Sequence, residues 1–356
     1  MSFQKFITNA VSEWMNGDGL DADIAISSRV RLARNLRDQP FPMLATDSQL
    51  DQVIAQVEQA MEDEAFKRQG HFEMIRMDAL TPLQKRVLME KHLISPNLLA
   101  DSRKGAVILS ENEAVSIMVN EEDHLRIQCL FSGLQLKEAW EAADRIDDIF
   151  EKHINFAFDE RRGFLTSCPT NVGTGIRASV MMHLPGLVMT QQINHILSAI
   201  NQLGLVVRGL YGEGSEAIGN LFQVSNQVTL GQSEEEIIEN LTSVTRQIIE
   251  REREARHSLM HNHRLQLENR VCRSYGILTN ARIIESKEAA ERLSDVRLGI
   301  DLEIIKGIPL SVMNELMVMT QPGFLQQYAG QELTADSRDE RRARLIRERL
   351  QSTMES

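Results

Sequence analysis

The sequence of 356 residues has few cysteines and no long apolar run. Its cysteines, Cys129, Cys168 and Cys272, are far apart, odd in number and outside the close pairs typical of a zinc site. This usage is typical of a reducing cytoplasm, so we expect no structural disulfide. No apolar run reaches the roughly 20 residues that a membrane-spanning helix needs, so we expect no membrane span.

A signal peptide and an excess of basic charge are also missing. Residues 1–15, MSFQKFITNAVSEWM, place apolar side chains near one face of a helix, which predicts an amphipathic helix without the apolar core of a signal peptide. Lys and Arg number 39 and Asp and Glu 51, giving a formal net charge of −12. This balance argues against direct nucleic-acid binding by the surface as a whole. An acidic enzyme would instead favour basic substrates.

The patterns that are present mix helix and strand signals. A length of 356 residues with 42% hydrophobic content suits two domains. Residues 106–109 and 114–119 predict a hairpin joined by the polar segment 110–113. Further strands are expected at 125–130, 176–182, 205–209 and 219–224, and helices at 47–69, 81–93, 135–153 and 191–203. Because strands and helices do not alternate strictly, we expect an α+β fold with a mostly antiparallel sheet flanked by helices.

The C-terminal part is expected to be helical. Ser233 and Glu236 form a capping-box signature at the start of a long apolar stripe. Strand signals almost vanish after about Arg256. Helices are expected at 264–273, 286–298, 309–319 and 337–350. We therefore predict a first domain of residues 1–256 and a helical domain of residues 257–356.

Two stretches contain groups suited to phosphate. Residues 166–177, TSCPTNVGTGIR, combine a thiol, glycines, hydroxyls and an arginine, which suits a phosphate cradle, a nucleophile's loop or a plain turn. In residues 27–34, SSRVRLAR, Arg29 and Arg31 would share one face of a strand and could hold phosphate oxygens there. Alternating arginines are also common on a solvated strand face, so neither stretch decides the function by itself.

Two further stretches contain carboxylates. Residues 120–126, NEEDHLR, follow an apolar strand, and such a cluster can bind metal, act as a base or simply solvate a loop. In residues 207–214, VRGLYGEG, a strand delivers Arg208 into a glycine-rich loop that also contains Glu213. Glycine permits close approach of a ligand, but one such loop is weak evidence for a nucleotide site.

Taken together, these stretches resemble the catalytic domain of the phosphagen (guanidino) kinases over roughly residues 21–256. NEEDHLR and CPTNVGTGIR (168–177) are the most specific matches. SSRVRLAR, His92 in EKHLISPNLLA, the RG…GE pattern at 208–213 and Val224-Ser225-Asn226 support them. The resemblance implies that family's glutamine-synthetase-like antiparallel fold and transfer of the γ-phosphate of ATP, with Mg²⁺, to a guanidinium group.

The resemblance also implies a cage of arginines around the ATP phosphates. Phosphoryl transfer depends mainly on positioning and on neutralising charge, so several cations aided by Mg²⁺ would serve it. No separate metal site built from protein side chains is expected. The expected nucleotide-binding residues are Ser28, Arg29, Val30, Arg31, Leu32, His92, Arg126, Arg177, Ala178, Ser179, Val180, Arg208, Gly209 and Gly212.

The expected catalytic residues are Glu122, Glu213 and Cys168. Glu122 and Glu213 match the family's two carboxylates that align a guanidinium and remove its proton, a step needed because a protonated guanidinium is no nucleophile. Glu121 is either a helper through metal-bound water or a solvated structural residue. Cys168 matches the family's reactive cysteine, which lies beside the guanidinium, and nearby cations would favour its thiolate. For an isolated cysteine, a small buried apolar role would be the better interpretation.

One departure from the phosphagen kinases points to a protein substrate. Those enzymes have an additional N-terminal helical domain, and here the first matching motif begins near Asp23. An open guanidine site on an acidic protein suits an arginine displayed by another polypeptide. This departure and the helical tail resemble the bacterial protein arginine kinases, which implies roles in the stress response and in marking proteins for degradation.

The tail contains a candidate regulatory segment. Residues 337–343, SRDERRA, predict a charged helix start in which Ser337 and Glu340 form a capping box. The resemblance adds a phosphoarginine site in which Arg338, Asp339 and Arg342 take part. It also implies a transcriptional repressor among the substrates, an activator protein, a Clp-type protease partner and a homodimer. Apolar residues that suit either self-association or the tail's own core are Ile304, Ile308, Leu310, Val312 and Met313.

Three alternative functions remain open at this point. A kinase of a small guanidino compound such as free arginine would use the same residues. A cysteine-dependent guanidine hydrolase would explain Cys168 but leave the arginine cage unexplained. A noncatalytic phosphoarginine-binding module would be expected to lack the carboxylates or cage arginines, and all of them are present.

Overall fold

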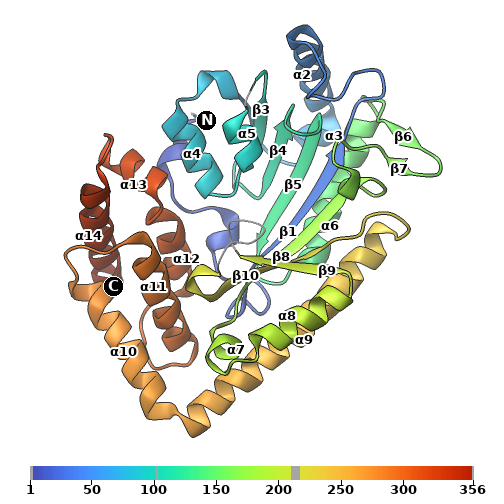
Figure 1. Ribbon diagram of the computed structural model, residues 1–356. Coiled ribbons are helices and arrows are strands. Elements are labelled where there is room, and N and C mark those ends of the chain that lie inside the picture. The colour runs from blue at the N-terminus through green and yellow to red at the C-terminus, as the bar shows by residue number, and fades with distance from the viewer. Residues whose placement is uncertain (1–2, 102, 210–216, 355–356) are drawn as a thin grey trace.

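The computed structural model describes residues 3–101, 103–209 and 217–354. Its centre is an eight-stranded sheet in which each strand is antiparallel to its neighbours, in the order β2-β3-β4-β5-β1-β8-β10-β9 (Figure 1). The strands of this sheet are β1 Ala25–Arg34, β2 Phe72–Arg76, β3 Ala106–Ser110, β4 Val115–Val119, β5 Leu125–Ser132, β8 Ile176–His183, β9 Leu205–Gly209 and β10 Leu221–Asn226. Strands β6 Phe158–Asp159 and β7 Gly163–Phe164 form a separate pair. The predicted α+β fold with its β3–β4 hairpin is confirmed.

The helices also follow most of the predicted pattern. They are α1 Gln4–Thr8, α2 Asp47–Met61, α3 Glu64–Lys67, α4 Pro82–Glu90, α5 Pro96–Ala100, α6 Leu136–Glu151, α7 Pro185–Met189, α8 Ile193–Gln202, α9 Glu234–Asn262, α10 Arg264–Asn280, α11 Ser286–Asp301, α12 Leu310–Met319, α13 Pro322–Ala329 and α14 Ala335–Met354. Short 3₁₀ turns are η1 Glu13–Met15, η2 Met77–Ala79, η3 Pro169–Asn171 and η4 Ile218–Asn220. Within the described ranges, none of these helices has the length and apolar character needed to cross a membrane.

Two helix predictions were wrong in detail. The N-terminal helix expected over residues 1–15 covers only Gln4–Thr8, because Asn9 is extended and its side chain accepts a hydrogen bond from Val11 N at 3.1 Å. The helix expected over 47–69 ends at Met61. Asp63 then caps the short helix α3 by accepting a hydrogen bond from Ala65 N.

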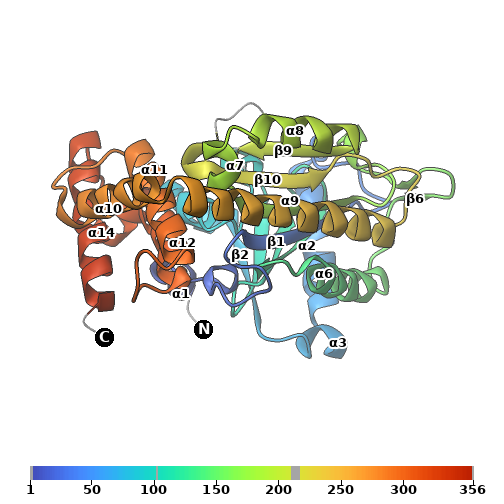
Figure 2. The same ribbon diagram turned by 90° about the horizontal axis from the view of Figure 1, so that it is seen from below.

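One face of the sheet packs against helices α6, α8 and α9 (Figure 2). Val30 and Leu32 on β1, together with Ala178 and Val180 on β8, are fully buried on this face. Alternate residues of a strand point to opposite faces. Arg29 and Arg31, which alternate with Val30 and Leu32 along β1, therefore point to the other face.

The other face is only partly covered by apolar groups. The N-terminal segment, α4, α5 and the tail residues Val318 and Phe324 form a second apolar cluster against Met118, Leu130 and Met181 of the sheet. Glu90 at the end of α4 accepts hydrogen bonds from the backbone N–H groups of Gly323 and Phe324, both at 2.8 Å. The tail is thus anchored beside the polar part of this face.

The long helix α9 leads from the sheet into the tail of helices α10 to α14 (Figure 1). The Ser233 capping box predicted at its start is confirmed. The helix continues through Arg256 to Asn262, so the boundary expected at residue 256 lies inside it. In the tail, Ile308, Val312 and Met313 are buried in its own apolar core. These candidates for self-association therefore have a role within the chain.

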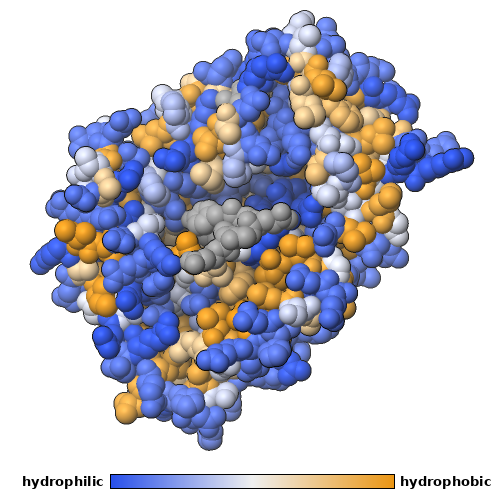
Figure 3. Space-filling model, viewed as in Figure 1, coloured by the Kyte–Doolittle hydropathy of each residue, from blue (hydrophilic) through white to orange (hydrophobic). Residues whose placement is uncertain are grey.

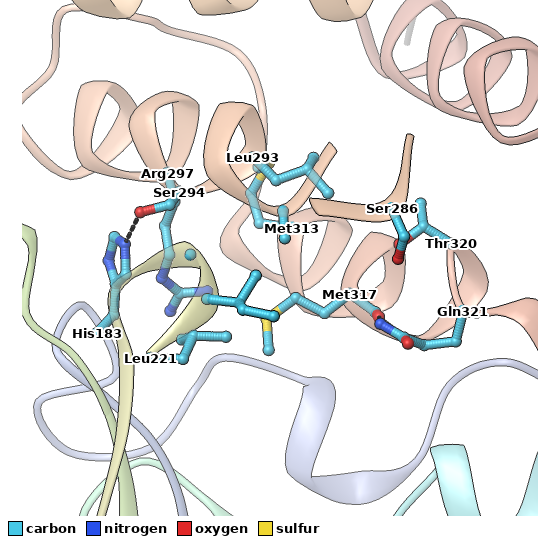
Figure 4. Close-up of a pocket in the computed structure, with 13 residues that line it drawn as sticks. His183, Leu221, Ser286, Leu293, Ser294, Arg297, Met313, Met317, Thr320 and Gln321 are labelled. Carbon is cyan, nitrogen blue, oxygen red and sulfur yellow. Dashed lines mark hydrogen bonds between the residues drawn. The ribbon is translucent and has the colours of Figure 1, made fainter. Parts of the chain in front are cut away.

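Buried polar groups join the tail to the end of the sheet (Figure 4). The His183 ring of β8 is 2.8 Å from Ser294 Oγ of α11. Arg297 donates to Asn314 Oδ1 and to the Ala22 carbonyl. Burial, with help from two nearby arginines, lowers the pKa of His183 well below its usual value and keeps the ring neutral.

Candidate active site

Five arginines from four strands of the sheet gather on its polar face: Arg29 and Arg31 of β1, Arg126 of β5, Arg177 of β8 and Arg208 of β9. The strand register pairs Arg31 with Arg177, and Gln223 of β10 with Arg208. The side-chain alternation of the sheet then brings all five to one face. Figure 3 shows that this side of the molecule is hollowed, with hydrophilic residues above the hollow and several hydrophobic ones below it.

The arginine cluster is electrostatically strained. Burial, then repulsion by Arg126, lowers the pKa of Arg29 to about 10. Burial lowers the pKa of Arg31 well below its usual value, and Arg29, Arg126 and Arg177 lower it further. The folded protein therefore disfavours these charges, and a polyanion bound among them would relieve the repulsion.

Neighbouring polar side chains orient part of the cluster. Arg29 donates to Gln223 Oε1 at 2.9 Å. Arg177 donates to the Asn226 carbonyl at 2.7 Å and to Asn171 Oδ1 at 3.1 Å. The buried Nε of Arg31 has no hydrogen-bond partner among the described residues. A ligand with acceptor oxygens would satisfy this group.

A pocket of about 1190 Å³, its open mouth included, lies over the cluster. Arg29, Arg31 and Arg208 line it together with apolar residues that include Met317 of the tail. His92 also lines the pocket and packs edge-on against Trp14, with ring centroids 5.5 Å apart. Burial and the nearby Arg29 lower the pKa of His92 to about 3, so the ring is neutral. The pocket thus combines phosphate-suited cations with uncharged rings.

The acid cluster NEEDHLR meets the arginines at Arg126. The guanidinium of Arg126 contacts Glu121 at 2.8 Å and Glu122 at 3.0 Å. Burial raises the pKa of the half-buried Glu122, an effect that Arg126 partly offsets. A carboxylate with a raised pKa is a stronger base, which suits proton removal from a guanidinium. The expected partner Glu213, and Gly212 beside it, lie outside the described residues.

The cysteine loop is fixed to the acid cluster by Asp123, which sequence reasoning missed. Asp123 is fully buried and accepts hydrogen bonds from Ser167 N at 2.7 Å and from Asn35 Nδ2 at 2.6 Å. The half-buried Cys168 lies next to Ser167, with Sγ 3.0 Å from Thr170 Oγ1. The sequence did contain a signal for this role, because Asp123 stands in an acid cluster between two apolar strands. A carboxylate buried at such a place needs hydrogen-bond donors from other segments.

The remaining expected nucleotide-site residues divide between the two faces. Ser179 lies on the arginine face, 3.4 Å from Arg29 Nε, and Gly209 borders the same pocket. Ser28 is buried and donates to the Gly133 carbonyl. The side chains that point away from the arginines are those of Ser28, Val30, Leu32, Ala178 and Val180.

In the tail, the segment SRDERRA begins differently from the prediction. Thr334, not Ser337, caps helix α14, because Thr334 Oγ1 accepts from the backbone N–H of Ser337. Arg342 is buried, pairs with Asp339 and donates to the Thr320 and Ile284 carbonyls, each at 2.9 Å. Arg342 therefore positions Asp339, which is half-buried like Arg338.

Comparison with protein families agrees with this geometry. Residues 52–255 match the C-terminal catalytic domain of the ATP:guanido phosphotransferases. Residues 264–356 match the protein-arginine kinase McsB C-terminal domain. The chain therefore belongs to the ATP:guanido phosphotransferase family.

Its curated relatives include proteins named protein-arginine kinase. The relative from Brevibacillus brevis is 66% identical over 350 residues, covering 98% of each chain. The relative from Halalkalibacterium halodurans is 63% identical over 356 residues and covers both chains completely. Similarity at this level extends over the sheet and the tail alike.

Solved structures show the same fold at low identity. A lombricine kinase is 23% identical with a TM-score of 0.57, covering 67% of this chain and 68% of its own. The duplicated taurocyamine kinase from Schistosoma mansoni is 21% identical with a TM-score of 0.58, covering 75% of this chain and 40% of its own. These similarities support the fold assignment.

Proposed function

We propose that this protein transfers the γ-phosphate of ATP to the guanidinium of arginine residues in proteins. The observation that carries the proposal is the gathering of five arginines on one face of the sheet, where three of them line one pocket and Arg126 contacts Glu122. Extensive similarity to protein-arginine kinases over both parts of the chain supports a protein substrate.

The arginines hold the phosphates of ATP and neutralise the group in transfer. Phosphate oxygens satisfy Arg31 and draw Arg126 away from Glu122. No group of three or more Cys, His, Asp or Glu side chains suited to a metal ion occurs within residues 3–101, 103–209 and 217–354. In this proposal, Mg²⁺ enters as part of the Mg-ATP substrate. His92 lies near the nucleotide.

Glu122 aligns the acceptor guanidinium and takes its proton as the new N–P bond forms. Its pKa is raised already, and departure of Arg126 toward the phosphates strengthens the base further. Glu213 is the second carboxylate of the pair. Cys168 lies beside the guanidinium without attacking phosphorus, and Glu121 holds Arg126 in place.

The test is incubation with Mg-ATP and an arginine-rich protein. Acid-labile phosphate mapped to arginine is expected, whereas phosphate confined to serine or threonine contradicts the proposal. Rates with free arginine and with proteins decide between this function and a small-molecule guanidino kinase. A higher catalytic efficiency on free arginine would favour the latter.

We also propose that Arg338 and Asp339 bind phosphoarginine, with Arg342 holding Asp339 in place. Double substitution of Arg338 and Asp339 by alanine is expected to abolish phosphoarginine binding, measured by calorimetry, while basal ATP chemistry continues. Unchanged binding contradicts this assignment. We propose further that the protein is a cytoplasmic homodimer. Its substrates include a transcriptional repressor, and its partners include an activator and a Clp-type protease. It acts in a stress-response pathway that marks proteins for degradation.

A further inference from the structure

A groove of about 820 Å³, its mouth included, lies beside the acid cluster. Glu122 lines it, so a molecule seated in the groove touches the carboxylate that the proposed mechanism uses. Asn120, Asp101, Pro42 and Met43 also line it. The groove thus joins the reaction centre to residues that have no part in holding ATP.

A buried acceptor in this groove lacks a donor. Asn120 is 4% exposed, and its Nδ2 donates to the carbonyls of Leu50 and Lys104, both at 3.0 Å. These two bonds fix the orientation of the amide, which leaves Oδ1 as the buried acceptor. Asn120 Oδ1 has no hydrogen-bond partner in the described part of the chain. A ligand that brings an N–H group, such as a peptide or a guanidinium, would satisfy it.

Met43, which lines the groove, and its neighbour Leu44 in the chain are two exposed apolar residues. Met43 is 78% exposed and Leu44 is 77% exposed. Their loop is held firmly, because Arg103 donates to the Ala45 carbonyl at 2.8 Å and to the Pro42 carbonyl at 3.3 Å. Apolar groups presented on a fixed loop lose little conformational freedom on binding a partner.

The same loop is tied to the acid cluster through His124. Nδ1 of His124 accepts from Leu36 N at 3.1 Å, so Nε2 carries the proton and donates to the Pro40 carbonyl at 3.0 Å. Burial lowers the pKa of His124 to about 4, so this arrangement persists at neutral pH. His124 therefore fixes the distance between the apolar rim and Glu122.

The charge of the groove favours a basic occupant. Asp101, Glu121 and Glu122 line it, while the lining cation Arg103 is engaged by loop carbonyls and contacts Asp47 at 3.4 Å. A basic polypeptide segment complements this surface, and its apolar residues would cover Met43 and Leu44.

We propose that this groove binds the polypeptide segment around the target arginine. A peptide N–H donates to Asn120 Oδ1, and a large apolar side chain next to the arginine packs on Met43 and Leu44. This proposal rests on the proposed function, because the groove selects the residues that flank the arginine phosphorylated at the same site. It predicts that apolar-flanked arginines are preferred over arginines flanked by serine or glycine.

The test compares short peptides with one central arginine flanked by leucine or by serine. Catalytic efficiency is measured for the unchanged protein and for the double variant Met43→Ser with Leu44→Ser. A roughly tenfold preference for the leucine peptide is expected, from burial of one apolar side chain, and the double variant should lose it. Leu20→Ser and Leu265→Ser, at leucines 59% and 75% exposed, are matched controls that should keep the preference. Transfer to N-acetyl-arginine amide should be equal in all variants.

Equal efficiencies for the two peptides in the unchanged protein would overturn the docking proposal while leaving arginine phosphorylation intact. A loss of preference in both leucine controls would overturn it as well. If no peptide is phosphorylated, the proposed function fails instead. In that case, binding of a fluorescent leucine-flanked peptide without ATP still tests the groove, and equal affinity for the double variant overturns the proposal.

Discussion

The two faces of the central sheet differ sharply although the same strands build them. On β1, Val30 and Leu32 are fully buried under the helices. Arg29 and Arg31, which alternate with them along the strand, point into the polar pocket. The apolar face stabilises the fold through burial. The arginine face opposes folding, because burial and mutual repulsion disfavour its charges.

This difference predicts that substitutions at adjacent positions of a strand have opposite effects on stability and on activity. A change on the apolar face should lower stability and leave the chemistry intact. A change on the arginine face should remove activity and leave the stability unchanged or higher, as is common where a site is strained for function. Four substitutions test this contrast.

Glu122→Gln should have the largest effect. It keeps the size of the side chain but removes the proposed base, so the rate of phosphate transfer should fall by about 10²–10⁴-fold. The melting temperature should change little, because Glu122 is half-buried and its burial already disfavours the charge. Transfer from radiolabelled ATP and thermal melting measure the two quantities. A variant with an unchanged rate would remove Glu122 from the mechanism.

Arg31→Met should separate activity from stability most clearly. Loss of one cation of the proposed phosphate site should lower catalytic efficiency by about 10²–10³-fold. Relief of repulsion by Arg29, Arg126 and Arg177 should raise the free energy of unfolding by about 1 kcal/mol.

The exposed Arg68→Met serves as its control, with no expected change in efficiency. Urea unfolding and steady-state kinetics give the two values. A destabilised Arg31→Met protein would contradict the view that the cluster is strained.

Val30→Ala should do the reverse. Removing two methyl groups from a fully buried side chain should lower the free energy of unfolding by about 2 kcal/mol. Catalytic efficiency at low temperature should stay near that of the unchanged protein, because the side chain points away from the pocket. Val11→Ala, at a valine 39% exposed, is the matched control in the same unfolding experiment. A large loss of efficiency in folded Val30→Ala would show that the two faces are coupled.

Cys168→Ala should have the smallest effect, about tenfold on the rate. The thiol lies beside the proposed guanidinium position and does not form a bond to phosphorus, so substantial transfer should remain. Mass spectrometry during turnover should detect no phosphocysteine. A trapped covalent phosphate on Cys168 would assign it a nucleophilic role.

The sequence predicted the presence of helices and strands better than the residues at which they begin and end. Two apolar runs joined by a short polar segment located the β3–β4 hairpin, and the Ser233 capping box located the start of α9. Edge strand β2 and helix α13 were not predicted. The N-terminal helix failed because a local hydrogen bond of Asn9 competes with helical bonding, which periodicity does not detect.

Sequence motifs indicated the candidate residues of the active site. The register in which the strands pair decided which of their side chains lie close together. Arg29, Arg31 and Arg177 share a face because β1 and β8 pair in one particular register. The buried links through Asp123 and His124 escaped prediction, since their partners lie 44 to 88 positions away in the chain. Motif neighbours such as Val30 and Ala178 proved to be core residues on the other face.

By itself, the sequence determined the α+β class, the helical tail and the two kinds of charged group that the chemistry needs. These depend on local periodicity and residue type, which a linear pattern contains. The tertiary structure decided that arginines from four strands share one face of the sheet and that the tail closes part of the pocket on this face. It also decided that Glu122 lines a groove with an Asn120 oxygen that has no partner within the described residues. Strand register and long-range hydrogen bonds bring those groups together, and both depend on the packing of the whole sheet.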